Sequence, residues 1–246
     1  MILMAVPKPI INRKEFEVYD VIHETPDVDI FQLKDEDNTK LNFDPGMFVM
    51  LTSINPGSDP KEVTRAFSIA SAPQTDTLEF YIHMIHGKFT SRLDNAKIGD
   101  KLLVTGPYGQ FKFVPNEDKK TLFIAGGTGL APMMSMLRAI KNSAADTDCV
   151  MFYSVRFPNE ILSGEELKSL ENEIRLKNII TVTRESEQRW DGERGHINSD
   201  MIKRHCNDYS DRTVYICGPL EFVKAMKQAT TELGINNVKV KADVWG

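Results

Sequence analysis

A glycine cluster, Gly126-Gly127-Thr128-Gly129, separates an apolar run at residues 121–125 from a helical pattern that begins at Ala131. A sharp turn from a strand into a helix exposes backbone N–H groups that bind phosphate, and glycine lets the phosphate approach the backbone. Pro132 suits the first helical turn, where its missing N–H costs little. The cluster predicts a nucleotide-binding turn formed by Gly127, Thr128 and Gly129. A purely structural turn is the alternative, because dinucleotide fingerprints have Gly or Ala at the position of Pro132.

Basic and small residues follow the later apolar runs of the same half. Arg156 ends the second run, where NAD-type folds usually carry an acid that binds ribose hydroxyls, and Arg184 ends the third. These arginines indicate either contacts with a 2′-phosphate, which favours NADPH over NADH, or solvated surface side chains. Cys217-Gly218-Pro219 ends the last run, at the edge where ligands of open α/β sheets bind. A buried small residue is the alternative role for Cys217.

The elements that must position these residues differ between the two halves of the chain. The first half contains six β-branched and aromatic-rich runs, at residues 15–24, 29–35, 47–53, 65–71, 77–85 and 101–107. Turn residues separate these runs, which predicts an antiparallel barrel or sandwich, with a short helix at 91–96. From residue 121 strands alternate with helices, which predicts a parallel sheet covered on both faces. We therefore expect one domain at residues 1–115 and a second at 116–246.

Composition excludes several classes of protein. A length of 246 residues fits two domains of about 100–150 residues each. The formal net charge of −5 offers no broad attraction to nucleic acid or to an anionic membrane. No apolar run has the roughly 20 residues of a membrane span, and the first residues do not resemble a signal peptide. Cys149, Cys206 and Cys217 are too far apart for an iron–sulfur or disulfide framework, so we expect a cytoplasmic protein without a metal site.

Six short motifs follow one another along the chain. They are Arg65-Ala66-Phe67-Ser68, Gly87-Lys88-Phe89-Thr90, Gly106-Pro107-Tyr108-Gly109, Gly126-Gly127-Thr128-Gly129, Cys217-Gly218-Pro219 and Asp243-Val244-Trp245. In these motifs and their order, the chain resembles the ferredoxin–NADP reductase family over nearly its whole length. The resemblance implies two domains. An N-terminal antiparallel six-stranded β-barrel would bind flavin, and a Rossmann-like parallel α/β domain would bind NAD(P).

The resemblance also assigns roles in the first half. Arg65 binds the flavin phosphate, Phe67 packs on the isoalloxazine ring where the family usually has Tyr, and Ser68 donates a hydrogen bond near N5. Ile82-His83-Met84 matches the strand that follows the ribityl and phosphate portion. Gly87-Lys88-Phe89-Thr90 opens the short helix as a pyrophosphate cradle. Taken without the other motifs, the first motif indicates an ordinary strand with an exposed Arg and a core Phe, and Thr90 a plain helix cap.

The last residues match a further feature of the family, whose members often finish with an acid, one residue and an aromatic that covers the flavin. Here the sequence reads Asp243-Val244-Trp245-Gly246. We expect a C-terminal tail in which Trp245 shields the flavin until nicotinamide displaces it. Trp in place of Tyr, Asp in place of Glu and the added Gly246 depart from the family pattern.

The activity implied by the resemblance is hydride transfer between NADPH or NADH and a flavin, with FAD favoured over FMN. Electrons then pass to a separate acceptor such as ferredoxin, flavodoxin or an iron–sulfur or oxygenase component. Ser68 is expected to act at flavin N5, Cys217 beside the nicotinamide, and Asp243 in proton exchange or charge balance. The alternatives are an electron-transfer flavoprotein subunit of a larger redox complex and a nucleotide sensor without turnover. The first usually adds a C-terminal cysteine cluster, and the second leaves the flavin motifs unexplained.

Overall fold

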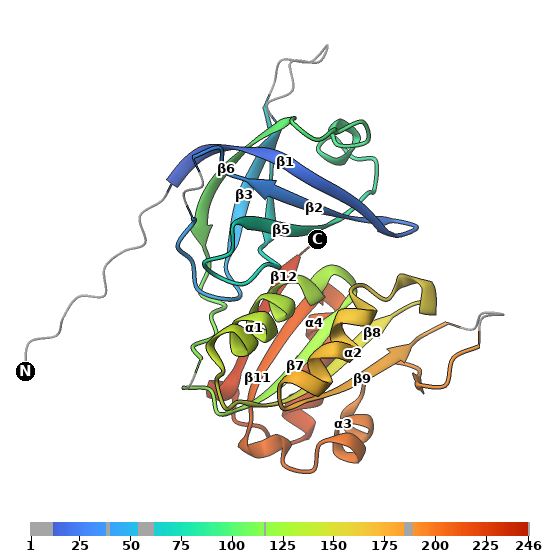
Figure 1. The fold of residues 1–246 in the computed structure, drawn as a ribbon. Helices are drawn as coiled ribbons and strands as arrows, with labels where there is room; N and C mark the ends of the chain where they lie inside the picture. Colours follow the sequence, from blue (N-terminus) through green and yellow to red (C-terminus); the bar gives the residue numbers. More distant parts are fainter. Residues whose placement is uncertain (1–11, 38–39, 54–61, 116, 185–188, 246) are drawn as a thin grey trace, which may run out of the picture.

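A computed structural model describes residues 12–37, 40–53, 62–115, 117–184 and 189–245. In the described part of the first half, six strands form one antiparallel sheet. They are β1 (Asn12–Thr25), β2 (Val28–Lys34), β3 (Phe48–Ser53), β4 (Val63–Ser68), β5 (Thr77–His83) and β6 (Lys101–Tyr108). Their order is β4-β3-β6-β1-β2-β5, and the edge strands β4 and β5 contact each other, so the sheet curls into a barrel (Figure 1). The predicted barrel is confirmed.

The short helix expected at 91–96 is instead a single 3-10 turn, η1 (Thr90–Arg92). Its hydrogen bonds reach three residues back, from the N–H of Leu93 to the carbonyl of Thr90. The Thr90 hydroxyl oxygen accepts the N–H of Gly87 at 2.9 Å, which closes a tight loop before the turn. The predicted cradle at residues 87–90 is therefore a loop, with the hydroxyl of Thr90 already bonded inside it.

The described part of the second half forms a parallel sheet of six strands in the order β10-β9-β8-β7-β11-β12. The strands are β7 (Lys120–Gly126), β8 (Asp148–Val155), β9 (Leu176–Val182), β10 (Glu193–Arg194), β11 (Thr213–Pro219) and β12 (Val240–Trp245). The helices are α1 (Leu130–Ser143), α2 (Gly164–Glu173), α3 (Ser199–His205) and α4 (Leu220–Glu232), with 3-10 turns η2 (Gly127–Gly129), η3 (Pro158–Glu160), η4 (Tyr209–Asp211) and η5 (Asn237–Lys239).

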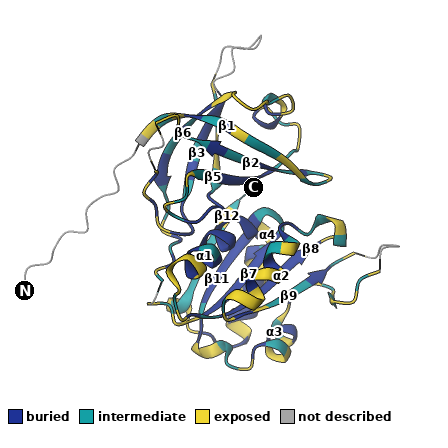
Figure 2. Ribbon diagram, viewed as in Figure 1, coloured by how far each residue is buried: buried dark blue, intermediate teal, exposed yellow. Residues whose placement is uncertain are grey.

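Both faces of this sheet are covered, because successive strand residues point to opposite sides. Phe123 of β7 packs in the cluster that contains the apolar residues of α1 and α2, whereas its neighbour Ile124 packs with those of α3 and α4. The strands are accordingly buried along most of their length (Figure 2). The predicted α/β half is confirmed. None of the helices in the described ranges combines the length and apolar character needed to cross a bilayer.

Residues 240–245, which include the motif Asp243-Val244-Trp245, form β12 at the edge of the sheet. This strand pairs with β11 in parallel, with Asp243 beside Cys217 and Trp245 beside Pro219. Strand pairing fixes the backbone of Trp245, so its position is set by the sheet and not by a flexible terminus.

Apolar and polar contacts join the two halves. Val28, Ala70 and Tyr81 of the barrel half belong to the same buried cluster as the methionines of α1. The Tyr81 hydroxyl lies 2.6 Å from Ser163 Oγ, at the start of α2. These contacts set the barrel against the carboxyl ends of the parallel strands (Figure 1).

Candidate active site

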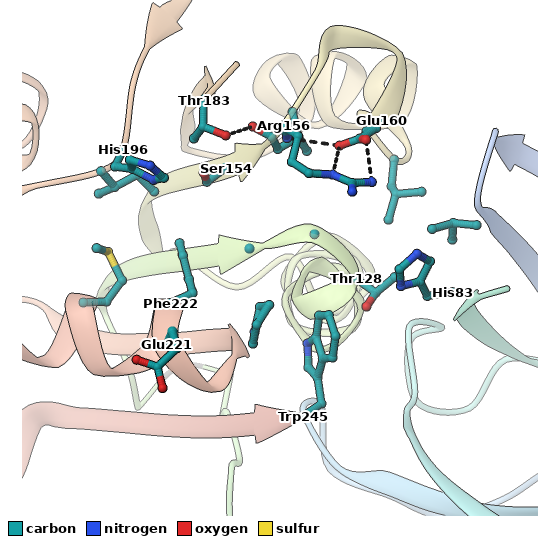
Figure 3. A pocket seen from close by; sticks show the side chains of 18 of the residues that line it. His83, Thr128, Ser154, Arg156, Glu160, Thr183, His196, Glu221, Phe222 and Trp245 are labelled. Atoms are coloured by element: carbon teal, nitrogen blue, oxygen red, sulfur yellow. Dashed lines mark hydrogen bonds and ion pairs between the residues drawn. The ribbon is translucent and has the colours of Figure 1, made fainter. Parts of the chain in front are cut away.

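Two adjoining cavities lie where the barrel meets the carboxyl ends of the parallel strands. The first, called here the barrel cavity, has a volume of about 510 Å³, and the second, the sheet cavity, about 560 Å³. His83, Thr128 and Trp245 line both cavities and form their shared wall (Figure 3). Both volumes are in the range of small-molecule and cofactor sites.

The barrel cavity collects most of the residues predicted to bind flavin. Its lining comprises Phe48, Arg65, Ala66, Phe67, Ser68, Tyr81, His83, Ile85, Gly87, Lys88, Phe89, Thr90, Thr128, Ala131, Asp243, Val244 and Trp245. They come from β3, β4, β5, the loop before η1, η1 itself, the glycine turn, α1 and β12. Motifs that are far apart in the sequence therefore meet in one place.

Ile82 and Met84 do not line this cavity. Side chains alternate along β5, so Ile82 points into the barrel core, where it is fully buried, and Met84 packs against the same core. Tyr81 and His83 point the other way, into the cavity. The same alternation, counted back from His83, would have identified Tyr81 in the sequence.

The barrel cavity offers cations and aromatic rings. Arg65 is exposed, and its guanidinium donates to the Thr64 carbonyl oxygen at 2.8 Å. Within the described part of the chain neither Arg65 nor Lys88 pairs with a carboxylate, so both charges are available to a phosphate. The rings of Phe67 and Phe89 lie against each other with centroids 5.3 Å apart.

The sheet cavity follows the carboxyl ends of β7, β8, β9 and β11. Its lining comprises Asp27, Val28, His83, Gly126, Gly127, Thr128, Ser154, Val155, Arg156, Glu160, Leu162, Thr183, His196, Ile197, Pro219, Glu221, Phe222, Ala225, Met226 and Trp245. Gly127 has a left-handed φ of 55°, and a Cβ there would point toward the Trp245 ring at 4.0 Å. Gly126, Gly127 and Thr128 of the glycine turn therefore line the sheet cavity, and Gly129 does not.

Gly129, Cys217 and Gly218 lie behind the lining of both cavities. A Cβ on Gly129 would lie 2.3 Å from the Cys217 carbonyl oxygen, so this glycine allows the turn to pack against β11. Cys217 is 1% exposed, and burial, together with the neighbouring Asp243 carboxylate, raises the pKa of its thiol. Burial also raises the pKa of Asp243, which lines the barrel cavity.

The two candidate arginines differ in their surroundings. Arg184 does not line the sheet cavity, and its guanidinium lies over the Phe157 ring, 5.8 Å from the centroid. Arg156 does line it and is held by two carboxylates. Its Nη2 lies 2.6 Å from Glu160 Oε1 (Figure 3). The same nitrogen lies 2.8 Å from Asp27 Oδ2. Neither Glu160 nor Asp27 belongs to any of the sequence motifs.

An unpaired buried polar atom lies at the shared wall. The indole N–H of Trp245 is one of four buried side-chain polar atoms without a hydrogen-bond partner among the described residues, and it is the one of the four whose residue lines these cavities. Such groups are rare in native proteins and are satisfied when a ligand supplies an acceptor. Together with the unpaired cations and the aromatic rings of the barrel cavity, this atom fits a bound flavin at the shared wall.

Comparison with known proteins gives the family. The oxidoreductase FAD-binding domain family matches residues 15–113, and the oxidoreductase NAD-binding domain family matches residues 123–228. The stachydrine N-demethylase reductase subunit of Rhizobium meliloti is 32% identical over 86% of this chain and 60% of its own length. NADH-cytochrome b5 reductase 1 of Mortierella alpina is 31% identical over 95% of this chain and 80% of its own length. A solved ferredoxin reductase in carbazole 1,9a-dioxygenase superposes with a TM-score of 0.85 at 27% identity, covering 98% of this chain and 71% of that chain.

The chain belongs to the ferredoxin–NADP reductase family of FAD- and NAD-binding oxidoreductases. This confirms the resemblance, the two-part fold class and the expected pair of cofactors. The chain spans 60% of the length of the first relatives, the reductase subunits of stachydrine N-demethylase and glycine betaine monooxygenase.

Proposed function

We propose that this protein is a flavin-dependent NADH reductase that passes electrons to a separate acceptor protein. In this proposal residues 1–115 bind FAD and residues 116–246 bind the nicotinamide nucleotide. The observation that carries the proposal is the shared wall of His83, Thr128 and Trp245, which places a nucleotide cavity directly against a flavin-type cavity. FAD bound in the barrel cavity would accept hydride from the nicotinamide and release the electrons one at a time to the acceptor.

The barrel residues hold the flavin. Arg65 and Lys88 supply the positive charge for its phosphates, because neither is neutralised within the described chain. Phe67 would pack against the isoalloxazine ring, and the Ser68 hydroxyl would donate a hydrogen bond to it. The Trp245 side chain, which lines both cavities, would separate the flavin from the nucleotide site until nicotinamide displaces it.

Asp243 and Cys217 support the reacting groups from adjacent strands. Asp243 Oδ1 accepts the N–H of Val244 at 3.0 Å, which leaves Oδ2 to hold a proton. Burial favours that protonated form by raising the pKa of Asp243. We assign Asp243 to proton exchange at the flavin and Cys217 to the packing behind the nicotinamide site.

The preference for NADH follows from the charges of the sheet cavity. Among the described residues that line it, Arg156 is the single Lys or Arg, and its guanidinium is already paired with two carboxylates, Asp27 and Glu160. A third carboxylate, Glu221, lines the cavity and pairs with Lys224. A 2′-phosphate carries close to two negative charges and is repelled there. A ribose hydroxyl, by contrast, donates to a carboxylate such as Glu160. These contacts lead us to propose NADH, whereas the sequence positions of Arg156 and Arg184 favoured NADPH.

The acceptor belongs to one of the classes named by the relatives. These are reductase subunits of a demethylase and a monooxygenase, and a cytochrome b5 reductase. We propose an oxygenase component or a small electron carrier such as ferredoxin. We also propose a cytoplasmic location, since the three cysteines are free and buried.

Anaerobic spectroscopy tests this function. The purified protein, reconstituted with FAD if necessary, should be yellow and should be bleached by NADH at least tenfold faster than by NADPH. A protein that takes up no flavin contradicts the proposal. Flavin binding without bleaching by either nucleotide would favour the electron-transfer subunit.

A further inference from the structure

The turn between β1 and β2 carries an acid from the barrel half into the nucleotide site. Asp27 Oδ2 lies 2.8 Å from Arg156 Nη2, although the two residues are 129 positions apart. The same oxygen lies 3.1 Å from Nε2 of His83, which belongs to the wall shared by the two cavities. Asp27 therefore brings a carboxylate of the barrel half into contact with Arg156 in the sheet cavity.

The position of Asp27 is built into the barrel. Its carbonyl oxygen accepts the N–H of Met84 at 2.8 Å, just after β5. The Thr25 hydroxyl donates to its second carboxylate oxygen at 3.4 Å. The carboxylate is 33% exposed and the Arg156 side chain 48% exposed, so water partly screens their interaction and the position of Asp27 depends on these backbone and hydroxyl bonds. A preorganised acid of this kind holds a guanidinium with little entropic cost.

We propose that Asp27 is a specificity-determining residue that selects NADH by occupying Arg156, which otherwise would bind a 2′-phosphate. This inference rests on the proposed function. Arg156 donates to Glu160 from its backbone N–H, from Nε and from Nη2, so Glu160 fixes the base of the side chain. The Asp27 carboxylate accepts a further hydrogen bond from Nη2 of the same guanidinium. Removing Asp27 leaves an anchored guanidinium with free N–H donors facing the cavity.

The control of specificity thus lies outside the domain that binds the nucleotide. A nucleotide-binding half alone would present Arg156 with one carboxylate, and the whole chain presents it with two. Because a guanidinium pairs with phosphate as readily as with carboxylate, Asp27 and a 2′-phosphate compete for the same donors.

Binding of adenosine phosphates to the flavin-loaded protein tests the inference. The probes 5′-AMP and 2′,5′-ADP differ only in the 2′-phosphate, and calorimetry gives the Kd of each. We expect Asp27→Asn and Asp27→Ala to tighten 2′,5′-ADP about tenfold, as for one charge-assisted hydrogen bond, and to leave 5′-AMP within about twofold. The matched control is Asp29→Asn, which removes the same charge from the same hairpin, where Asp29 contacts His23 and not Arg156.

A double-mutant cycle separates this role from a structural one. In an Arg156→Leu background, Asp27→Asn should no longer improve the binding of 2′,5′-ADP, because the competing group is gone. Unchanged 2′,5′-ADP affinity in both Asp27 variants, or an equal gain without Arg156, overturns the inference. If the wild-type protein is bleached by NADH while the Asp27 variants show no gain, this inference alone fails. If neither nucleotide bleaches the wild type, the proposed function fails.

Discussion

The side chain of Asp243 lies in the wall of the barrel cavity, beside the buried Cys217 of the neighbouring strand. Burial raises the pKa of Asp243 above its ordinary value of 3.8, so the folded protein binds this proton more tightly than the unfolded chain. Stability therefore falls as pH rises from about 4 through the folded-state pKa, and the penalty is complete above it. We expect Asp243→Asn to raise Tm by about 2 °C near pH 8 and to leave it unchanged near pH 4.

Calorimetry of the flavin-loaded protein across this pH range measures the difference. Glu117→Gln serves as the control, because it removes a carboxylate from an exposed position. A gain in Tm of the same size at both ends of the range would contradict titration of Asp243 as its origin.

Residues that stand together in one short motif can be recognised as site candidates from the sequence. Arg65, Phe67 and Ser68 reach the barrel cavity together because they share one strand. Asp27 and Glu160 carry no motif, and their importance depends on the fold bringing them to Arg156. No pattern of types or spacing indicates that kind of contact before the two halves are assembled.

At the scale of elements, the glycine turn is expected to be most sensitive at Gly129. A Cβ there would lie 2.3 Å from the Cys217 carbonyl oxygen and 2.8 Å from Gly218 Cα, both of which belong to the backbone of β11. Because a strand backbone cannot move aside cheaply, we expect Gly129→Ala to lower the free energy of unfolding by about 2–3 kcal/mol. Urea unfolding measures the loss.

Gly164→Ala provides the comparison for this substitution. Its Cβ would meet only the side-chain Cγ2 of Ile161, at 3.2 Å, and α2 gains a better helix former. We expect a change within about 1 kcal/mol. Equal unfolding midpoints for the two alanine variants would show that the turn and β11 are not packed as described.

The elements also show where sequence patterns are ambiguous. The predicted strands of both halves are present because apolar alternation and buried runs identify them reliably. No strand is predicted at residues 240–245, and they form β12 because their backbone pairs with β11. That pairing joins segments far apart in the sequence, so no local pattern indicates it. At η1 the Thr90–Gly87 bond selects a tight turn over the expected helix.

At the scale of the whole molecule, the site exists only because the two halves are held in one arrangement. The fold class and the order of the domains follow from the change of pattern near residue 115. The contact between the two halves does not follow from that pattern. Arg138, for example, binds Glu79 and Glu166, which lie 59 and 28 positions away in the chain. Long-range polar contacts of this kind have no sequence period, and their geometry is fixed by packing.

Arg138 on α1 is expected to couple the unfolding of the two halves. Its guanidinium is 16% exposed and lies 2.6 Å from the carboxylates of both Glu79 in β5 and Glu166 in α2. It also donates to the Ala70 carbonyl oxygen at 2.9 Å. Arg138→Met leaves a poorly exposed carboxylate on Glu79 without its cation, which costs about 3–5 kcal/mol. We therefore expect the variant to unfold in two steps, one for each half.

Two spectroscopic signals separate these steps. Both tryptophans, Trp190 and Trp245, lie in the second half, so their fluorescence follows that half, whereas far-ultraviolet circular dichroism follows the whole chain. The two denaturation curves should coincide in the wild type and diverge in Arg138→Met. Lys141→Met is the control, because Lys141 lies about one turn further along α1 and pairs with Glu173 of the same half. Coincident curves in Arg138→Met would assign the coupling to the apolar cluster that contains Tyr81 and the methionines of α1.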